Sequence, residues 1–216
     1  ATEPTFVGRL AGVGKLSKEL AIALCAVGPT LRASGVPMDV RKDDPYAVYD
    51  EIPFEVCTAD SCDVLGRAVV RVKELMQSYA IIEFLLKNLP AGPIKVKAPR
   101  KVKENEVFSR YEAPRGENVH YIKSNGSDKP ERLKVRAPTL ANYPATIAML
   151  KDGFIADIPL IFAAIDPCIC CAERLVQLDD ARNGESQVLT FSQLRQMADQ
   201  RYKNVNFKKK EALWPF

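Results

Sequence analysis

The sequence predicts an α+β fold in which helices dominate and one small antiparallel sheet is inserted. Three observations lead to this prediction. Apolar residues recur at three- and four-residue steps over residues 65–86, as on one face of a long helix. Short strand-like segments separated by turn residues fill 107–137, as in a meander. Two apolar stretches, 139–151 and 156–165, then lead to a cysteine cluster and are expected to be helices.

The N-terminal part is expected to consist of a glycine-containing segment over residues 1–16, one helix and a long ordered loop. Ser17 would cap a helix that runs to Val27, and Gly28-Pro29 would end it. Residues 34–58 are rich in polar and aromatic groups and are expected to form a loop, with a short strand at Ile52–Val56.

Asp63 would cap the longest helix, which Leu89–Pro93 would end. We expect its packed face to carry seven apolar positions: Leu65, Val69, Val72, Leu75 or Met76, Tyr79, Ile82 and Leu86. A basic connector over 95–106 then leads to three strands, at Val107–Ala113, Asn118–Ser124 and Glu131–Ala137. A last strand near 188–191 and a helix near 192–202 follow the cysteine cluster.

Composition narrows the class of protein. With 216 residues and 47% hydrophobic residues, the chain can bury a core in one or two domains. No run of about 18 apolar residues occurs, so no bilayer-spanning segment is expected, and no signal-peptide pattern begins the chain. The net charge of +4 is scattered, which argues against a nucleic-acid partner. Six irregularly spaced cysteines favour metal binding or reduced thiols over a disulfide framework.

The segment from Asp166 to Arg174, Asp-Pro-Cys-Ile-Cys-Cys-Ala-Glu-Arg, carries the strongest chemical signal. Thiolates are soft ligands, and the spacing of Cys168 and Cys171 lets both sulfurs reach one centre. That spacing alone also fits zinc, an iron–sulfur cluster or a redox dithiol. By contrast, the remaining candidates are expected to be structural: Cys25, Cys57 and Cys62 as buried thiols, and His120 as a packed or surface residue.

Asp-Pro-Cys-x-x-Cys-x-x-Arg resembles the C-terminal signature of the [NiFe] hydrogenase large subunit, in the version of the membrane-bound, energy-converting group. Other segments resemble the same family in the same order: Asp43–Tyr46, Leu89–Pro93, Glu112–Gly116 and Ala137–Thr139 with Asn142. The first two also resemble the related quinone-reducing subunit of complex I. The resemblance implies the C-terminal half of a hydrogenase large subunit over 1–174, with an extension at 175–216.

The resemblance also implies roles for individual residues. Cys168 would be a terminal nickel ligand able to accept a proton, and Cys171 would bridge nickel and iron. Arg115 would place a cation beside the open coordination position, and Asp166 would pair with it. Four residues would line the carbonyl and cyanide ligands of the iron, with the threonine donating to a cyanide: Ala113, Pro114, Pro138 and Thr139. Cys170 would not be a ligand.

The implied Ni–Fe centre needs four thiolates, and no second Cys-x-x-Cys precedes Cys168. The remaining thiolates would come from the missing N-terminal half of the large subunit, or the chain has lost metal binding. Further implied partners are a small subunit with a 4Fe–4S cluster and membrane subunits that move ions. The implied location is peripheral, on the cytoplasmic side of the membrane. Residues 175–216 would be either a peptide removed during maturation or a retained strand–helix element.

The expected function is therefore reversible reduction of protons to dihydrogen. Two alternatives stay open at this point. One is a complex-I-like reductase of quinone or a sulfur compound that lacks nickel, against which the paired cysteines argue. The other is a non-catalytic assembly subunit, stabilised by zinc or free of metal.

Overall fold

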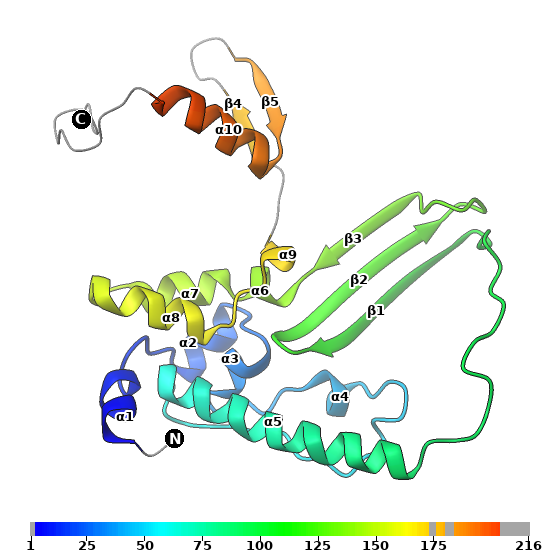
Figure 1. Ribbon diagram of the computed structural model, residues 1–216, viewed down its shortest axis with the longest axis horizontal. Helices are drawn as coiled ribbons and strands as arrows, with labels where there is room; N and C mark the ends of the chain where they lie inside the picture. Colours follow the sequence, from blue (N-terminus) through cyan, green and yellow to red (C-terminus); the bar gives the residue numbers. More distant parts are fainter. Residues whose placement is uncertain (1–2, 173–175, 180–183, 204–216) are drawn as a thin grey trace. The chain divides into compact units, whose positions relative to one another are not determined.

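The computed structural model describes residues 3–172, 176–179 and 184–203. The chain divides into two compact units, Ala1–Cys171 and Ala172–Phe216. The first unit is dominated by helices and holds one three-stranded antiparallel sheet, which confirms the predicted fold class (Figure 1). In the second unit the described elements are strands β4 (Val176–Asp179) and β5 (Ser186–Leu189) and helix α10 (Phe191–Tyr202). No helix in the described part of the chain is both long and apolar enough to cross a bilayer.

Four short helices precede the long one: α1 (Pro4–Leu10), α2 (Lys18–Ala23), α3 (Gly28–Arg32) and α4 (Val40–Asp43). Ser17 caps α2 as predicted, because its hydroxyl accepts from the Leu20 N–H at 3.2 Å. The predicted end of this helix was wrong. The helix stops at Ala23, and Gly28-Pro29 begins α3, since proline is well tolerated in the first helical turn.

The predicted strand at Ile52–Val56 is absent from the structure, which describes all five residues. Ile52 and Phe54 are buried instead in a small apolar cluster with Ile81 of α5. Packing against a helix therefore explains the apolar residues of this segment, and none of the described strands pairs with it.

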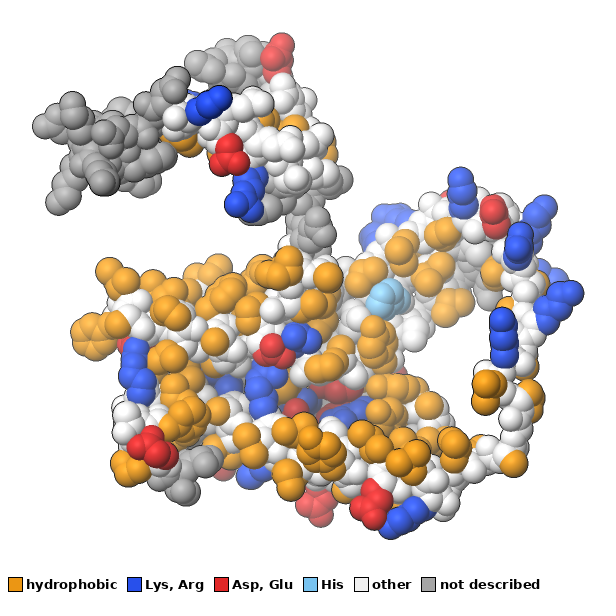
Figure 2. Space-filling view, viewed as in Figure 1, with side chains coloured by type: hydrophobic (Ala, Val, Ile, Leu, Met, Phe, Trp, Pro, Cys, Tyr) orange, Lys and Arg blue, Asp and Glu red, His pale blue; other side chains and the backbone are white. Residues whose placement is uncertain are grey.

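Helix α5 (Val64–Lys87) begins at Asp63, whose carboxylate accepts from the Gly66 N–H at 2.8 Å. The predicted start and end of this helix are confirmed. The face predicted to be packed is exposed over most of its length, so that prediction was wrong. At five of the seven predicted positions the residues named have more than half of their surface exposed: Val72, Leu75, Met76, Tyr79, Ile82 and Leu86. Orange side chains accordingly lie on the surface along this helix (Figure 2). The face that packs inside this chain carries Gly66, Arg67 and Val70, which are smaller or charged.

The sheet has the strand order β1 (Asn105–Ala113), β2 (Gly116–Ser124) and β3 (Arg132–Arg136), as the meander prediction required. Ala113 pairs with Gly116, so only Pro114 and Arg115 connect the first two strands. This tight turn projects from the sheet toward the helices, where α3 and α6 both contact β2 (Figure 1).

Helices α6 (Pro138–Ala141) and α7 (Tyr143–Leu150) replace the single helix predicted over 139–151. A 3-10 turn, η1 (Ile155–Asp157), leads into α8 (Ile158–Ala164), and α9 (Ile169–Ala172) follows. The main core joins these helices to α2, α3 and α5 through buried apolar residues, among them Leu16, Leu31, Val64, Ala145, Met149, Ile161 and Ile165.

Two glycines bring the β1–β2 turn into backbone contact with the start of α3. Gly28 has φ +65°, and a Cβ atom there would lie 2.4 Å from Gly116 Cα and 2.5 Å from the Arg115 carbonyl oxygen. A Cβ atom on Gly116, whose φ is +127°, would lie 2.7 Å from the Gly28 nitrogen. Neither position leaves room for a side chain. The contact therefore fixes the turn that carries Arg115.

We predict that Gly28→Ala lowers the free energy of unfolding by at least about 2 kcal/mol, because it adds both a left-handed alanine and a backbone clash. Gly92→Ala is the matched control, since no heavy atom lies within 4 Å of its added Cβ. The control should change stability by less than about 0.5 kcal/mol. Urea unfolding measures both variants, and equal losses would contradict the close contact.

Candidate metal centre

The cysteine motif is built where a helix ends. Helix α8 stops at Ala164, and Asp166 takes a left-handed φ of 52°, a conformation that aspartate tolerates better than most residues. Pro167 prevents the helix from continuing. The chain then turns into α9, where the Cys171 N–H donates to the Cys168 carbonyl oxygen at 3.1 Å. Cys168 and Cys171 thus lie on one turn and are half-buried, whereas Cys170 is exposed.

The two thiols differ in acidity. The pKa of Cys168 is lowered, first by hydrogen bonding from the backbone and side chain of Cys171 and also by the positive charge of Arg115. Burial and the neighbouring Cys168 sulfur raise the pKa of Cys171, although Arg115 and the Thr139 hydroxyl act in the opposite direction. The first sulfur is therefore the one that ionises more readily without metal.

Arg115 and Asp166 meet as the resemblance implied. The Arg115 Nε donates to the Asp166 carbonyl oxygen at 2.6 Å, and its Nη2 lies 3.1 Å from the Asp166 carboxylate. Arg71 of α5 approaches the other carboxylate oxygen at 3.6 Å. Two cations thus flank one carboxylate directly before the cysteine motif. The guanidinium of Arg115 is held by two bonds to a single residue.

Asn142, the residue that separates α6 from α7, contacts both the β1–β2 turn and the residue before α3. Its buried side chain accepts from the Val27 N–H at 2.9 Å and donates to the Val27 carbonyl at 3.2 Å. The same amide nitrogen lies 3.5 Å from the Arg115 carbonyl oxygen. Asn142 therefore joins the start of α3, the β1–β2 turn and the helix pair that precedes the cysteines.

The four residues expected to line the diatomic ligands fall into two pairs. Thr139 is 1% exposed at the start of α6, and its Oγ1 accepts from the Cys168 N–H at 3.1 Å, with Pro138 buried beside it in sequence. The structure thus brings Thr139 to the cysteine motif. Ala113 and Pro114, which directly precede Arg115, line a pocket.

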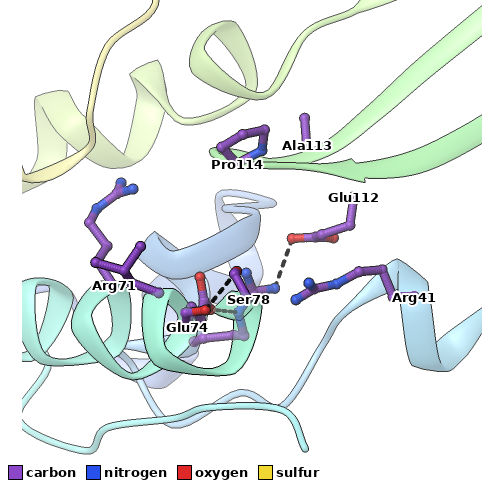
Figure 3. A pocket seen from close by; sticks show the side chains of 9 residues that line it. Arg41, Arg71, Glu74, Ser78, Glu112, Ala113 and Pro114 are labelled. Carbon is purple, nitrogen blue, oxygen red and sulfur yellow. Dashed lines mark hydrogen bonds and ion pairs between the residues drawn. The ribbon is translucent and has the colours of Figure 1, made fainter. Parts of the chain in front are cut away.

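The pocket beneath Ala113 and Pro114 has a volume of about 310 Å³ and charged walls. Figure 3 shows Pro114 and Ala113 above it, with Arg71, Glu74 and Ser78 rising from α5 on the opposite side. Arg32, Arg41 and Glu112 complete its polar lining. Since Arg71 also contacts Asp166, the pocket and the cysteine motif share a wall.

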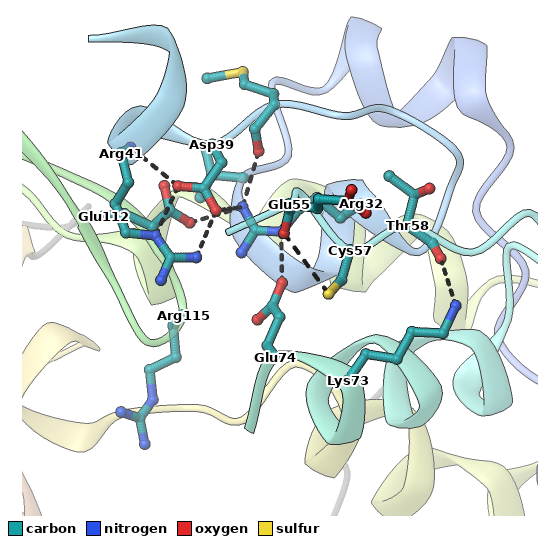
Figure 4. Close-up of polar contacts among 12 residues, drawn as sticks. Arg32, Asp39, Arg41, Glu55, Cys57, Thr58, Lys73, Glu74, Glu112 and Arg115 are labelled. Carbon is teal, nitrogen blue, oxygen red and sulfur yellow. Dashed lines mark hydrogen bonds and ion pairs between the residues drawn. The ribbon is translucent and has the colours of Figure 1, made fainter. Parts of the chain in front are cut away.

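Arg32 lies at the centre of a buried charge network at this pocket (Figure 4). Its guanidinium, 1% exposed, pairs with Glu74 at 2.7 Å and with Glu112 at 2.9 Å, and lies 3.6 Å from Asp39. Burial works against its charge, but the attraction of Glu112 and Glu74 outweighs it and raises the pKa of Arg32. Sequence reasoning missed this network. Of its members, only Glu112 belongs to a segment that the resemblance singles out.

The other candidate ligands stay apart from the cysteine motif. Cys57 and Cys62 are half-buried, and Cys25 is exposed just after α2, so the expectation of a buried Cys25 was wrong. His120 stacks on Tyr111 within the sheet at 5.9 Å between ring centroids. Arg174, the last residue of the motif, lies outside the described residues. No cluster of three or more His, Cys, Asp or Glu side chains suited to a metal occurs in the described ranges.

Two thiols on one turn fit half of a four-thiolate centre. Their shared orientation, the difference in acidity and the adjacent guanidinium suit a site for a cationic metal pair with anionic sulfur ligands. A closed structural zinc site would need two further ligands that the described residues do not bring to this turn. The residues present can therefore hold a metal only together with donors from elsewhere.

We predict that Arg32→Met lowers the free energy of unfolding by about 3–5 kcal/mol, because it leaves buried carboxylates without their partner. Lys87→Met is the control, since Lys87 and Glu83 form an exposed pair on α5. It should cost less than about 0.5 kcal/mol. Urea titration at neutral pH compares the two variants. Similar unfolding midpoints would show that the Arg32 network does not contribute to the stability of the fold.

Comparisons with known proteins identify the family of the chain. The family described as "Respiratory-chain NADH dehydrogenase, 49 Kd subunit" matches residues 1–103 and 100–174. The carbon monoxide-induced hydrogenase of Rhodospirillum rubrum is 44% identical over 173 residues, which cover 80% of this chain and 48% of that protein. A subunit of the NADH-quinone oxidoreductase of Dehalococcoides mccartyi is 46% identical over 168 residues, covering 77% and 46%.

Formate hydrogenlyase subunit 5 of Escherichia coli is 34% identical over 198 residues, covering 92% of this chain and 35% of that protein. Among solved structures, a chain of the archaeal membrane-bound sulfane sulfur reductase matches with a TM-score of 0.71 and 38% identity, covering 77% of this chain and 47% of that one. The chain thus spans half or less of the length of these relatives. It belongs to the family that unites the complex I 49 kDa subunit with the large subunits of [NiFe] hydrogenases.

Proposed function

We propose that this chain is the C-terminal half of the catalytic large subunit of an energy-converting [NiFe] hydrogenase, which reversibly reduces protons to dihydrogen. The observation that carries the proposal is the turn from Cys168 to Cys171, with Thr139 holding its backbone and the Arg115–Asp166 pair beside it. Two hydrogenases among the relatives support the same interpretation.

In the proposal, the two sulfurs hold a Ni–Fe centre with carbon monoxide and cyanide on the iron. When bound, that centre supplies the redox chemistry and the open coordination position at which dihydrogen is formed or split. With that centre bound, Cys168 would be a terminal ligand whose sulfur could still accept a proton, and Cys171 would be the bridging and less basic ligand. The lowered pKa of Cys168 favours the thiolate needed for binding.

The remaining residues orient and stabilise this site. Arg115 presents a fixed cation toward the cysteines, and Asp166 prevents its guanidinium from rotating away. Thr139 fixes the Cys168 backbone and has a hydroxyl proton left to donate, either to a sulfur or to a cyanide. Pro138, Ala113 and Pro114 contribute rigid apolar walls. Cys170 is not a ligand in this proposal.

The other two thiolates come from the N-terminal half of the large subunit. The exposed apolar stripe of α5 offers that half a packing surface. We further propose a small subunit with a 4Fe–4S cluster as the electron partner and membrane subunits that move ions. The structural relative is a chain of a respiratory membrane complex, which supports membership in a membrane complex. The location that we propose is peripheral, on the cytoplasmic side of the membrane.

The second candidate is a reductase of quinone or a sulfur compound that works without nickel. It is favoured by the 46% identity to an NADH-quinone oxidoreductase subunit and by the structural likeness to a sulfane sulfur reductase. The two cysteines on one turn argue against it, because a quinone site does not require paired thiolates. A zinc-stabilised or metal-free assembly subunit is the non-catalytic alternative.

Metal analysis and infrared spectroscopy of the complex purified from its own host separate these candidates. We expect nickel together with iron, infrared bands of carbon monoxide and cyanide, and hydrogen turnover that Cys168→Ser abolishes while the chain stays folded. Cys25→Ser, a change at an exposed thiol far from the motif in sequence, is the control and should leave turnover intact. Absence of both metals would favour the reductase, and zinc alone the assembly subunit.

We also propose that residues 175–216 are removed after nickel insertion. The described elements of the second unit form a strand pair and a helix with a capping box at Thr190 and Gln193, so part of this extension has a local fold of its own. Intact-mass measurement of the active protein from its host should find a chain that ends near Arg174. An active species ending at Phe216 would refute removal.

A further inference from the structure

The charged pocket beside the candidate metal centre has no role in the site described so far. It is bounded by α5 on one side and by the β1–β2 turn on the other (Figure 3). Its volume of about 310 Å³ has room for several water molecules, each of which needs ~30 Å³ in the liquid. The charged side chains that line it can bind such water, and Leu75, Ala113 and Pro114 form the apolar part of its lining.

Glu112 is the acid most enclosed by this pocket, with only 5% of its side chain exposed. One carboxylate oxygen accepts from Arg32 at 2.9 Å, and the other accepts from the Val40 N–H at 3.2 Å. Burial raises the pKa of Glu112, and the nearby Asp39 adds to this, while Arg32 opposes it. The carboxyl group is therefore held in a fixed place and is easier to protonate than an exposed glutamate.

Two residues that line the pocket, Glu112 and Arg71, connect it to the candidate metal centre. Glu112 lies three residues before Arg115 on the same strand and turn, and Arg115 is bound to Asp166. Arg71 lines the pocket and contacts the same aspartate. Its Nε is buried and has no hydrogen-bond partner among the described residues. A bound water in the pocket would satisfy such a donor.

We propose that Glu112 carries protons between the candidate metal centre and the water of this pocket. This inference rests on the proposed function and adds the route by which its protons travel. During dihydrogen formation, the Glu112 carboxylate takes a proton from a hydronium ion in the pocket, which leaves water behind, and becomes a carboxylic acid. It then releases the proton through water toward the Cys168 Sγ and is a carboxylate again. During dihydrogen oxidation the same proton moves outward. The electrons pass to or from the iron–sulfur cluster of the partner subunit, so Glu112 itself is never oxidised or reduced.

Glu74 completes the route at its outer end. It shares Arg32 with Glu112, and 18% of its side chain is exposed, compared with 5% for Glu112. The fixed guanidinium of Arg32 lies between the two acids (Figure 4). A proton therefore passes between them through water in the pocket, because arginine does not release its own.

The test variant is Glu112→Gln, which keeps the size and hydrogen-bonding capacity of the side chain and removes its proton exchange. The first readout needs no metal. Carbon-13 NMR of the glutamate carboxyl groups in the 216-residue chain should show one group that titrates above the ordinary glutamate value of about 4.3 and disappears in the variant. A Glu112 carboxyl that titrates at or below that value overturns the proposal.

The second readout uses the assembled hydrogenase. Glu112→Gln should slow exchange between deuterium gas and water by at least about tenfold. It should leave metal content, the carbon monoxide and cyanide bands and the conversion of para-hydrogen unchanged. Glu112→Asp, which keeps an acid, should recover part of the exchange. Ser78→Ala, which alters the same pocket without removing an acid, should exchange at the wild-type rate.

Unchanged exchange in Glu112→Gln, with the infrared bands present, overturns the carrier and leaves the proposed function standing. Loss of the bands in the variant also overturns it, because Glu112 would then be needed to build the centre. Absence of the bands from the wild-type complex contradicts the proposed function itself. The three results are distinguishable in one set of samples.

Discussion

The close contact between Gly28 and Gly116 is the constraint on which the candidate site depends. Two backbones touch where no side chain can fit, so the β1–β2 turn is held against the start of α3 without any adjustable group between them. Asn142 bonds to Val27 and approaches Arg115, which fixes the same junction from the α6–α7 side. The position of Arg115 relative to Asp166 follows from this junction. A looser turn would let the guanidinium swing into solvent.

The cysteine turn is fixed by different means. The left-handed Asp166 and Pro167 end α8 and start a new direction, and the Thr139 hydroxyl then binds the Cys168 N–H. Segments that lie far apart in the chain thus converge: α3 at residue 28, the turn at 115 and the motif at 168. Such convergence preorganises charge around a centre, which is what an electrostatically assisted redox site requires.

The two faces of α5 carry different kinds of side chain. Its inward side carries Arg67, Arg71 and Glu74, and the charges of the last two surround the pocket and the Asp166 carboxylate. Its outward side carries large apolar groups that the described part of this chain leaves exposed. The helix therefore resembles an internal element of a larger body. This agrees with relatives of which the matched part of the chain covers half or less.

Several features could be predicted from the sequence because they depend on local chemistry. Ser17 and Asp63 bond their own helix ends, and the turn residues between the strands identify the meander. The face on which α5 packs could not be predicted, because the 3.6-residue period gives an apolar stripe without saying which molecule covers it. The charge network around Arg32 could not be predicted from the sequence either. The sequence does not show that Arg32 is buried, because its partners Glu74 and Glu112 lie 42 and 80 residues away and approach it only in the folded chain.

The candidate site, too, could be predicted from the sequence only in part. The paired cysteines, Arg115 and Asp166 are found through their motifs, and the structure brings the arginine and the aspartate together. The sequence marks Asn142 only as part of a resembling segment, although it organises the junction. Of the four expected wall residues, Thr139 contacts the cysteine motif, while Ala113 and Pro114 line the neighbouring pocket. Contacts between distant segments leave no local pattern from which they could be predicted.

The most direct test of the central claim is a crystallographic or cryo-electron microscopy map of the complete assembly, with element identity established at the nickel and iron absorption edges in the crystal. The account predicts nickel bound by the Cys168 and Cys171 sulfurs at about 2.3 Å, a typical metal–thiolate distance, with iron on the Cys171 side and two further sulfurs facing the pair. A well-resolved site without metal, and with no second pair of sulfurs opposite, would contradict it.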